Sequence, residues 1–498
     1  MRNSYDVIVV GGGGSGLAAA VSAAEHGASV LLLEKEPALG GTTGIAVGSF
    51  TACGTSYQRS AHIEDDPLLH GEDVAKFAPP AIEECNNDAL RQFFLQHTAE
   101  TLEWLRGLGL TFHGPVPEPP NRVPRMHNVV PGAKAYIATL QARLLRLGGQ
   151  IICNANVREL VVESGRVMGV VAEVVDERKT FRACRGIVLA AGDYANSPEL
   201  IAAHKGRQFE AIEGVNPAAT GDGHRLAESV GARLVNMDLA NGPQIRFVAP
   251  PRRSVLDRLP VRLSAAVFPF VPRPLLHGLI KRVLVIWQRP ENALFADGAI
   301  LVNARGERFC DEAATPAREV ALARQPGKVG YILLDERLIA RYSAWPHYIS
   351  TAPEIAYAYV ADYLRLRPDV TALGSTPSEV ARARGIPAER LQATVEGRSL
   401  RGNRWLLLGP AKAYFTTTEG GTAVNERLQV LGENDAPIAG LYAVGQNGLG
   451  GMVLFGHGLH IAWALTSGRL VGLQLGAVAA AGEEPVASET ARDADGRT

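Results

Sequence analysis

The run Gly11-Gly12-Gly13-Gly14-Ser15-Gly16 constrains the fold of this chain more than any other feature. It follows a short β-branched run at residues 5–10 and precedes an alanine-rich stretch at residues 17–26 that has helical character. A second apolar run, residues 29–33, ends on Glu34. This order of strand, glycine-rich turn, helix, strand and acid is typical of a βαβ unit that opens a parallel sheet.

The glycine pattern matches GxGxxG, which indicates dinucleotide binding when it stands between a strand and a helix. Gly11 permits the tight turn, Gly13 lets the main chain approach a pyrophosphate, and Gly16 lets the helix pack on the strand. The helix N-terminus then faces the phosphates. Glu34 accepts hydrogen bonds from the adenosine ribose in such a site, and its charge disfavours a 2′-phosphate. The alternative is a glycine-rich turn that binds nothing.

Composition argues against several other classes of protein. The 50 lysines and arginines balance 51 aspartates and glutamates, so no net field attracts nucleic acid or an anionic membrane. Five scattered cysteines without a CxxC pair predict neither a disulfide framework nor a metal site, and they favour a reducing, cytoplasmic location. No apolar run is long enough for a membrane-spanning helix.

The chain is predicted to form two domains and a tail. Residues 241–420 have a mixed pattern and are predicted to be a domain inserted into a first one, which occupies residues 1–240 and 421–475. Residues 476–498 contain almost no large apolar side chain, so this tail is predicted to be disordered.

Local patterns predict the main elements. Periodicity predicts helices at residues 89–107, 133–147 and 377–395, the last interrupted near Gly385. Apolar runs predict strands at residues 151–152, 157–162, 167–175, 186–191 and 331–334. Residues 114–131 hold six prolines and are predicted to be loop.

One segment departs from the neutral charge balance. Between residues 251 and 290, eight basic residues and a single acid are interleaved with large apolar side chains. One interpretation is a basic amphipathic element that makes peripheral contact with a membrane surface. The other is a lid or an oligomer contact whose charges are solvated.

Further motifs resemble FAD-binding flavoproteins of the fumarate reductase and 3-ketosteroid dehydrogenase superfamily, and are closer to the ketone dehydrogenases. They span residues 5–473. In chain order they are EKEPALGGTT at 34–43, VLAAG at 188–192, TGDG at 220–223, GAILVN at 298–303 with Gly306, Arg308, Phe309 and Glu312, GLYAVGQ at 440–446, and Gly468-Arg469. The resemblance implies an α/β fold in which a Rossmann-like FAD-binding domain carries an inserted α+β substrate-capping domain.

The resemblance also implies which residues hold FAD. The ribose lies on Glu34, the adenine against the main chain of Val157, and the ribityl chain near Gln446. Segment 458–468 is a helix whose N-terminus points at the pyrimidine edge of the flavin, where reduction adds negative charge. Residues 40–44 contain no histidine for a covalent link, so non-covalent FAD is expected. The implied cofactor-binding residues are Gly11, Gly13, Ser15, Gly16, Glu34, Lys35, Gly41, Thr42, Thr43, Gly48, Val157, Ala191, Asp222, Gly445, Gln446, Leu459 and Ile461.

At the substrate position the chain departs from both branches of the superfamily. Fumarate reductases clamp two carboxylates with arginine and histidine, and they deliver a proton through an arginine. Pro316, Thr417 and the pair Leu454-Phe455 stand at those positions, and Arg318 substitutes only if its loop shifts. A dicarboxylate would lack bidentate donors, so fumarate or succinate is not expected as the substrate. The tyrosines of the ketosteroid enzymes are missing as well, at Pro316 and Leu454.

A few residues remain for the chemistry. The main-chain N–H of Gly458 is expected to polarise a substrate ketone. Tyr194 and His457 are the first and second candidates for the base that removes the α-proton, and Tyr414 with Glu419 is the third. It is equally open that Tyr194 packs with its hydroxyl on a main-chain carbonyl, and that His457 caps a helix or contacts the ribityl chain.

The expected activity is FAD-dependent α,β-dehydrogenation of an apolar, cyclic or steroid-like ketone in a pocket lined by Leu454 and Phe455. The β-hydride passes to flavin N5, and an external acceptor takes the electrons. One alternative is an enoate reductase with an external electron donor, because the chain has neither a haem motif nor a second nucleotide motif. The other is a non-redox flavoprotein, because the acid and base residues of the superfamily are missing.

Overall fold

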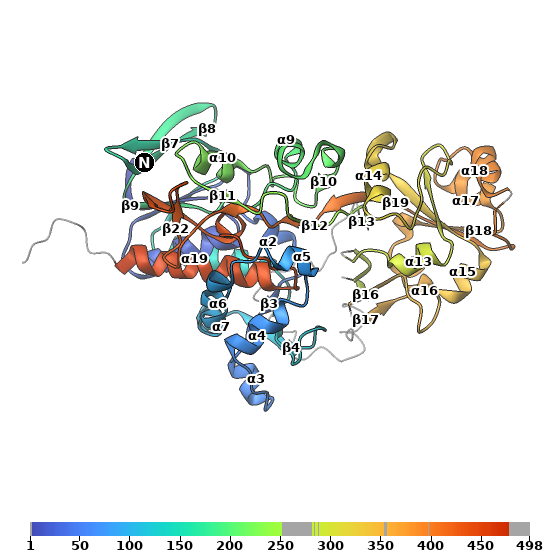
Figure 1. Cartoon of the computed structure of the whole chain (residues 1–498), viewed down its shortest axis with the longest axis horizontal. Helices are drawn as coiled ribbons and strands as arrows, with labels where there is room; N and C mark the ends of the chain where they lie inside the picture. The colour runs from blue at the N-terminus through green and yellow to red at the C-terminus, as the bar shows by residue number, and fades with distance from the viewer. Residues whose placement is uncertain are drawn as a thin grey trace, which may run out of the picture.

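The computed structural model of the chain describes residues 2–250, 281–282, 284–286, 288–352, 356–396 and 398–477. Most of the basic segment at 251–290 and nearly all of the predicted tail, residues 478–498, lie outside the described residues and stay predictions. Two sheets, each with its own hydrophobic core, form two bodies that lie side by side (Figure 1). Over the described residues, no helix has both the length and the apolar character needed to cross a membrane.

The first body is built on an eight-stranded sheet with a parallel centre. β1 (Ser4–Val10) pairs in parallel with β2 (Val30–Leu33) on one side and with β9 (Glu177–Leu189) on the other. β6 (Gln150–Ile152) extends the sheet beyond β2, and β23 (Pro437–Ala443) extends it beyond β9. β2 is buried along its whole length, which explains its unbroken apolar run.

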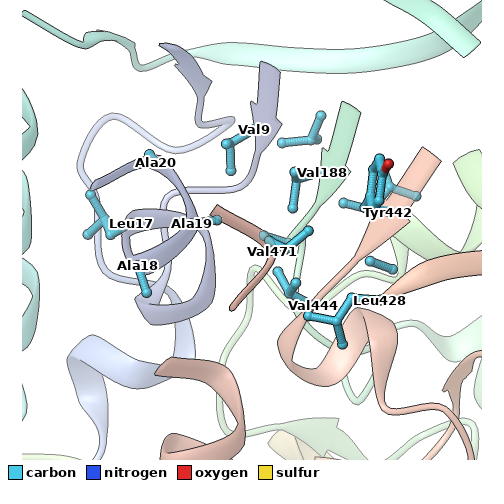
Figure 2. Packing of buried hydrophobic residues seen from close by; sticks show 14 of the residues in the cluster. Val9, Leu17, Ala18, Ala19, Ala20, Val188, Leu428, Tyr442, Val444 and Val471 are labelled. Atoms are coloured by element: carbon cyan, nitrogen blue, oxygen red, sulfur yellow. The ribbon is translucent and has the colours of Figure 1, made fainter. Parts of the chain in front are cut away.

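Two helices pack closely against each other and against this sheet. α1 (Gly14–Glu25) follows β1, and α19 (Leu459–Ala477) lies along it. A Cβ on Gly468 of α19 would lie 2.3 Å from the carbonyl oxygen of Ser15, so only glycine permits this approach. Figure 2 shows Val471 of α19 among the small side chains of α1 and the valines of the sheet.

Most of the predicted elements of this body are confirmed, and two are wrong. α8 (Lys134–Arg146), β7 (Ala155–Glu163) and β8 (Arg166–Val174) lie where periodicity places them, and β7 and β8 form a hairpin that joins β9. The single helix predicted at 89–107 is two helices, α6 (Asp88–Gln96) and α7 (Thr98–Gly107). The break comes at His97, which ends the first helix and caps the second.

The second error is the proline-rich stretch predicted as loop. It contains the end of β4 (Thr111–Val116) and all of β5 (Met126–Val130), and β5 pairs with β4 and with β3 (Ser49–Thr51). Residues 126–130 hold no proline, so every N–H of β5 is available for the ladders on both of its sides.

The second body is an antiparallel sheet around a long central strand, β19 (Trp405–Phe415). Its other strands are β10 (Glu213–Gly214), β13 (Gln244–Phe247), β14 (Ile300–Asn303), β15 (Gly330–Leu334) and β18 (Thr371–Gly374). β10 is the one described partner that runs parallel to β19. The predicted fold class, a Rossmann-like domain with an inserted α+β domain, is confirmed. The boundaries at 241 and 420 stay predictions.

Short elements complete both bodies. The remaining helices are α2 (Gly41–Ile45), α3 (Ser56–Ser60), α4 (Pro67–Val74), α5 (Pro80–Glu83), α9 (Pro198–Leu200), α10 (Asp222–Glu228), α13 (Asn292–Ala296), α14 (Ala317–Ala323), α15 (Glu336–Arg341), α16 (Val360–Leu366), α17 (Pro377–Ala383) and α18 (Ala388–Val395). The remaining strands are β11 (Leu234–Val235), β12 (Ala240–Asn241), β16 (Ser350–Ala352), β17 (Ala356–Ala358), β20 (Thr417–Thr418), β21 (Gly421–Thr422) and β22 (Gln429–Leu431). α19 continues to Ala477, so the first two residues of the predicted tail are helical.

Candidate active site

The glycine-rich turn between β1 and α1 is shaped by main-chain crowding. Gly11 has a φ of 110°, and a Cβ on it would lie 2.4 Å from the Ala190 carbonyl oxygen. A Cβ on Gly16 would lie 1.9 Å from the Gly11 carbonyl oxygen. Gly13 differs, because the nearest atoms to a Cβ on it are 3.9 Å away, in the turn at residues 40–41. The main chain at Gly13 therefore has room for the close approach of a pyrophosphate.

Glu34, at the end of β2, is buried, and both of its carboxylate oxygens accept main-chain hydrogen bonds. Oε2 accepts from Gly12 N at 2.6 Å, and Oε1 accepts from Glu36 N at 2.8 Å. Each oxygen keeps a second lone pair, so the carboxylate can also accept from ribose hydroxyls. The Glu34 carbonyl accepts from Ala155 N at 2.9 Å, which joins β7, and with it Val157, to this site.

Two further predicted cofactor residues contact each other. The Lys35 ammonium donates to Thr220 Oγ1 and to Asp222 Oδ2, both at 2.6 Å. This pair anchors the start of α10 beside the end of β2, so the TGDG motif lies next to Glu34 as the resemblance implies.

A second glycine turn packs on the first. A Cβ on Gly14 would lie 2.7 Å from Thr43 Oγ1, and a Cβ on Gly41 would lie 3.2 Å from the Cα of Gly13. Thr42 Oγ1 accepts from the side chain of Asn216 at 2.9 Å. Further along, the carbonyl of Gly48 accepts from the Tyr136 hydroxyl at 3.0 Å.

The ends of β9 and β23 supply the opposite side of the site. Ala191 N donates to Asn447 Oδ1 at 3.4 Å, and Gly445 N donates to Ser467 Oγ at 3.0 Å. The side-chain amide of Gln446 donates to Thr417 Oγ1 at 3.0 Å. Its Oε1 is buried and has no donor among the described residues.

These residues fit FAD. A buried amide oxygen without a donor is costly, and a ribityl hydroxyl would satisfy Gln446 Oε1. The open main chain at Gly13 and the remaining lone pairs of Glu34 suit the pyrophosphate and the ribose. When bound, FAD supplies two-electron chemistry. The resemblance had implied all of these positions, and the structure brings them together.

The first turn of α19 presents main chain to this site. Leu459 is buried and Ile461 packs against the core, so the side chains of both point inward. Gly458 has a φ of 79°, and a Cβ on it would lie 2.7 Å from Thr51 Oγ1 and 3.0 Å from the Ser49 carbonyl oxygen. No acceptor among the described residues takes the Gly458 N–H. A free N–H at a helix start suits the predicted role of polarising a carbonyl oxygen.

Beside Gly458, a buried glutamate holds His457 by its main chain and by its ring. Glu118 Oε1 accepts from His457 N at 3.0 Å, and the same oxygen contacts His457 Nδ1. The Glu118 side chain is 8% exposed, whereas the His457 side chain is 63% exposed. Glu118 Oε2 is buried and has no partner among the described residues. The outer nitrogen, Nε2, is therefore the one available to a ligand.

The charge near His457 is mixed. The hydrogen bond with Glu118 raises the pKa of His457 above its usual value, while two arginines of the second body, Arg246 and Arg289, oppose the rise. Arg246 lies on β13 and donates to Thr416 Oγ1 at 2.9 Å, and Arg289 is exposed just before α13. Burial and the nearby Arg289 lower the pKa of Arg246 to about 10. Positive charge thus gathers where the second body meets the first turn of α19.

A second histidine–glutamate pair lies one turn further along α19. His460 Nε2 contacts Glu419 Oε1 at 2.9 Å, and Glu419 Oε2 accepts from Leu454 N at 3.1 Å. Burial lowers the pKa of His460, but Glu419 and Asp193 outweigh this effect, so the pKa is raised. Asp193 is fully buried, and burial raises its pKa although it accepts from Thr417 Oγ1 at 2.6 Å. Glu419 is committed to these contacts and does not reach outward.

Tyr194, the first candidate for the base, lies in the core. Its side chain is fully buried and its hydroxyl donates to the Met237 carbonyl, which is the packing alternative. Burial raises the pKa of Tyr194 far above its usual value, so the phenolate is strongly disfavoured. The geometry therefore argues against Tyr194 as a base. Tyr414 lies on β19, where burial raises its pKa as well.

Two further expectations about the substrate side need correction. Leu454 is fully buried, so it cannot line a pocket, while Phe455 is partly exposed. Arg318 cannot replace a relay arginine, because its guanidinium is buried against Phe295 and bonded to Glu319, to Asn292 and to the Glu312 carbonyl.

Two hollows on the described surface lie away from these residues. One, of about 270 Å³, is lined by Cys85, Arg233 and Asn236 among others, and the other, of about 320 Å³, lies around Trp405 in the second body. Neither includes a predicted site residue. Glu118 was not predicted as a site residue from the sequence, because it lies among prolines in a stretch without a periodic pattern.

The chain is similar to known proteins in sequence and, where structures are solved, in fold. NADH:fumarate oxidoreductase of Klebsiella pneumoniae (strain 342) is 27% identical over 467 residues, which cover 89% of this chain but 44% of that protein. The open conformation of a flavocytochrome c3 fumarate reductase superposes with a TM-score of 0.71 at 24% identity, over 95% of this chain and 78% of that one. A 3-ketosteroid Δ1-dehydrogenase from Sterolibacterium denitrificans superposes with a TM-score of 0.64 at 19% identity, over 96% of this chain and 100% of that one. The two solved structures share the fold.

The family model described as FAD binding domain matches residues 6–244 and 268–455, which is most of the chain. Its range includes the glycine-rich turn, Glu34 and Gln446. The chain belongs to this FAD-binding family, and it is a FAD-dependent oxidoreductase.

Proposed function

We propose that the protein interconverts a carbon–carbon single bond and double bond next to a carbonyl group, with FAD as the redox cofactor. One observation carries the proposal: the free N–H of Gly458 and the titratable ring of His457 are neighbours at the N-terminus of α19. Such chemistry needs a donor that polarises the carbonyl oxygen and a group that exchanges a proton at the α-carbon.

The residues divide these tasks. The Gly458 N–H donates a hydrogen bond to the carbonyl oxygen on which the enolate charge develops, and the dipole of α19 stabilises the same charge. His457 Nε2 exchanges the proton, while Glu118 fixes the ring through Nδ1. Removing one such oxyanion donor costs about 3 kcal/mol of transition-state stabilisation in a known case. The FAD-binding residues of the first body place the cofactor on the other side of the substrate.

The first substrate class we propose is a cyclic or steroid-like ketone, which the protein dehydrogenates while an external acceptor takes the electrons. The free Gly458 N–H favours it, because one main-chain donor suffices for a ketone oxygen. The missing carboxylate clamp at Pro316, Thr417 and Leu454 also supports it.

A second candidate is reduction of an enoate with electrons from an external donor. Arg246 and Arg289 supply positive charge near His457, which a substrate carboxylate would neutralise. The similarity to a protein named NADH:fumarate oxidoreductase, which is 27% identical, favours the same candidate. Both candidates use the same proton-exchanging group.

Anaerobic mixing with a panel of ligands tests the proposal. Oxidised holoenzyme is mixed with cyclic ketones, saturated 3-ketosteroids and succinate. Holoenzyme reduced by light or by dithionite is mixed with the corresponding enones, fumarate and urocanate. We expect bleaching or recovery of the visible flavin band with at least one pair of compounds. A flavin that stays unchanged with every member of the panel would contradict the proposal and favour a non-redox role.

A further inference from the structure

The contact between Glu118 and His457 places a buried carboxylate directly against the ring of the proton-exchanging histidine. Glu118 is almost fully buried, and its Oε1 accepts two bonds from a single residue. The His457 ring is the one positively ionisable group that touches this carboxylate in the described part of the chain. A buried carboxylate is stable as an anion when a cation pairs with it, so it favours the charged imidazolium.

The same contact decides which nitrogen reacts. Nδ1 faces Glu118 and carries its hydrogen in both protonation states, because a carboxylate only accepts. Nε2 therefore gains and loses the proton, and 63% of the side chain is accessible. The groups that face the ring are Glu118 from the β4–β5 connection, Arg246 from β13 and Arg289 from the segment before α13, and on its own helix the Glu419–His460 pair is a turn away.

We infer that Glu118 is a positioning residue that directs the His457 ring outward and stabilises its charged form, so that His457 is the proton donor whenever the substrate is reduced. This inference rests on the proposed function. In the step, the carbon–carbon π bond breaks and the α-carbon takes the proton of His457 Nε2, while the cofactor, when bound and reduced, would supply the hydride for the β-carbon. The imidazole is left neutral and regains a proton from water. An external low-potential reductant would restore the two electrons and the proton that leave the cofactor as hydride.

The geometry explains why a donor suits this position. Both arginines oppose the charge of His457, yet its pKa is still raised, because the Glu118 contact is direct. The contact therefore favours the protonated ring, whose Nε2 proton can pass to a neighbouring carbanion or enolate. The reductive rate should be present below the pKa of His457 and fall as the pH rises through it.

Glu118→Gln separates the effect of the Glu118 charge from the effect of its hydrogen bond to the main chain. Its amide oxygen can still accept from His457 N, so the main-chain contact at the start of α19 is retained while the carboxylate charge is lost. Glu100→Gln is the matched control, because Glu100 lies 3.9 Å from His97 on the exposed face of α7. His457→Gln identifies the His457 resonance and removes the proton donor.

The first measurement is the pKa of His457 in the FAD-loaded protein by ¹H–¹⁵N NMR of labelled histidines. We expect Glu118→Gln to lower it by about one pH unit or more, and Glu100→Gln to leave it unchanged. An unchanged His457 pKa in Glu118→Gln overturns the inference, whatever the activity.

The second measurement is the rate at which enones, fumarate and urocanate reoxidise dithionite-reduced enzyme, against the rate at which the saturated partners bleach oxidised enzyme. We expect reoxidation to fall about tenfold or more at neutral pH in Glu118→Gln, to recover at lower pH, and to be affected more than bleaching. A Glu118→Gln profile identical to that of the wild type, or a loss of bleaching alone, overturns the inference. A flavin band that changes with no compound of the panel contradicts the proposed function instead. The NMR titration alone then shows whether Glu118 raises the pKa of His457.

Discussion

His457 and His460 each contact a buried glutamate, but their exposure gives them different capacities. The His457 side chain is 63% exposed and that of His460 is 22% exposed. A ligand can reach His457 directly, whereas His460 and Glu419 form an internal pair under the start of α19. We therefore assign proton exchange to His457 and a structural role to the internal pair of His460 and Glu419.

Tyr194→Phe separates the two leading candidates for proton exchange. We expect the variant to keep its flavin turnover, because the hydroxyl is committed to the Met237 carbonyl inside the core. Stability should fall by about 1–3 kcal/mol, since that carbonyl loses its donor. Stopped-flow flavin kinetics and urea unfolding measure both effects. Lost turnover with an intact FAD spectrum would restore Tyr194 as the base.

The predictability of the site depends on distance along the chain. Gly11, Gly13, Gly16 and Glu34 were predictable because the turn, the helix and the acid lie within one βαβ unit. Glu118 lies 339 residues from His457, so the pairing that sets the charge of the ring exists only in the folded protein. Tyr194 was overvalued for the same reason, because its partner Met237 could not be inferred.

At the scale of elements, the contact of β1, α1 and α19 holds the nucleotide turn in shape. α1 approaches the turn so closely that a Cβ on Gly16 would meet the Gly11 carbonyl oxygen at 1.9 Å. α19 then packs on α1 through Gly468. The turn is therefore rigid and preorganised for a phosphate group.

Gly16→Ala tests this contact. The added methyl group must displace the Gly11 carbonyl, so we expect FAD affinity to fall at least tenfold and the purified protein to lose its yellow colour. Gly107→Ala is the matched control, because a Cβ there meets no atom within 4 Å. That variant should retain FAD and gain up to about 1 kcal/mol from helix propensity. Fluorescence titration of apoprotein with FAD compares the two, and equal affinities would contradict the assignment.

A second element-scale feature is the buried arginine that holds α4 to β5. Arg125 is fully buried and bonds Asp65 at 2.7 Å and Asp73 at 2.5 Å. Asp73 also pairs with Lys76 and Arg122, but Arg125 is the one cation that pairs with Asp65 among the described residues.

Arg125→Gln removes that cation from a buried carboxylate, so we expect a loss of about 3–5 kcal/mol in the free energy of unfolding. Arg178→Gln removes an exposed ion pair with Glu159 and should cost less than about 1 kcal/mol. Denaturant unfolding checks both, and equal losses would contradict the burial argument.

The elements were predictable where a period was long and uninterrupted. α8, β7 and β8 follow their patterns because each packs one or both faces in a single core, whereas β9 begins nine residues before the predicted strand at 186–191. The break at His97 and the strands among the prolines were not predictable, because they depend on tertiary pairing and not on the local sequence pattern. The proline-free run at 126–130 was the signal that could have revealed β5.

At the scale of the whole molecule, the two bodies meet where β12 pairs with β20 (Figure 1). Thr416 contacts Arg246 of the second body, and the next residue, Thr417, contacts Gln446 and Asp193 of the first. This junction therefore links the cationic strand β13 to the FAD site. A change in the relative position of the bodies would alter the distance between Arg246 and His457.

The mode of cofactor attachment is also a property of the whole molecule. The structure holds the implied FAD positions in place by hydrogen bonds and packing, and residues 40–44 contain no histidine. We expect acid precipitation to release FAD into the supernatant in a one-to-one ratio with protein. A yellow pellet after repeated washing would show a covalent link and contradict this expectation.

The central claim is FAD-dependent interconversion of a single and a double bond next to a carbonyl group. Anaerobic stopped-flow spectroscopy of the visible flavin band, with oxidised and with reduced holoenzyme against paired saturated and unsaturated compounds, tests it most directly. We predict a change of the flavin band with at least one pair, and its loss in His457→Gln at unchanged FAD content. A flavin that responds to no pair, or a His457→Gln variant with wild-type rates, would contradict the account.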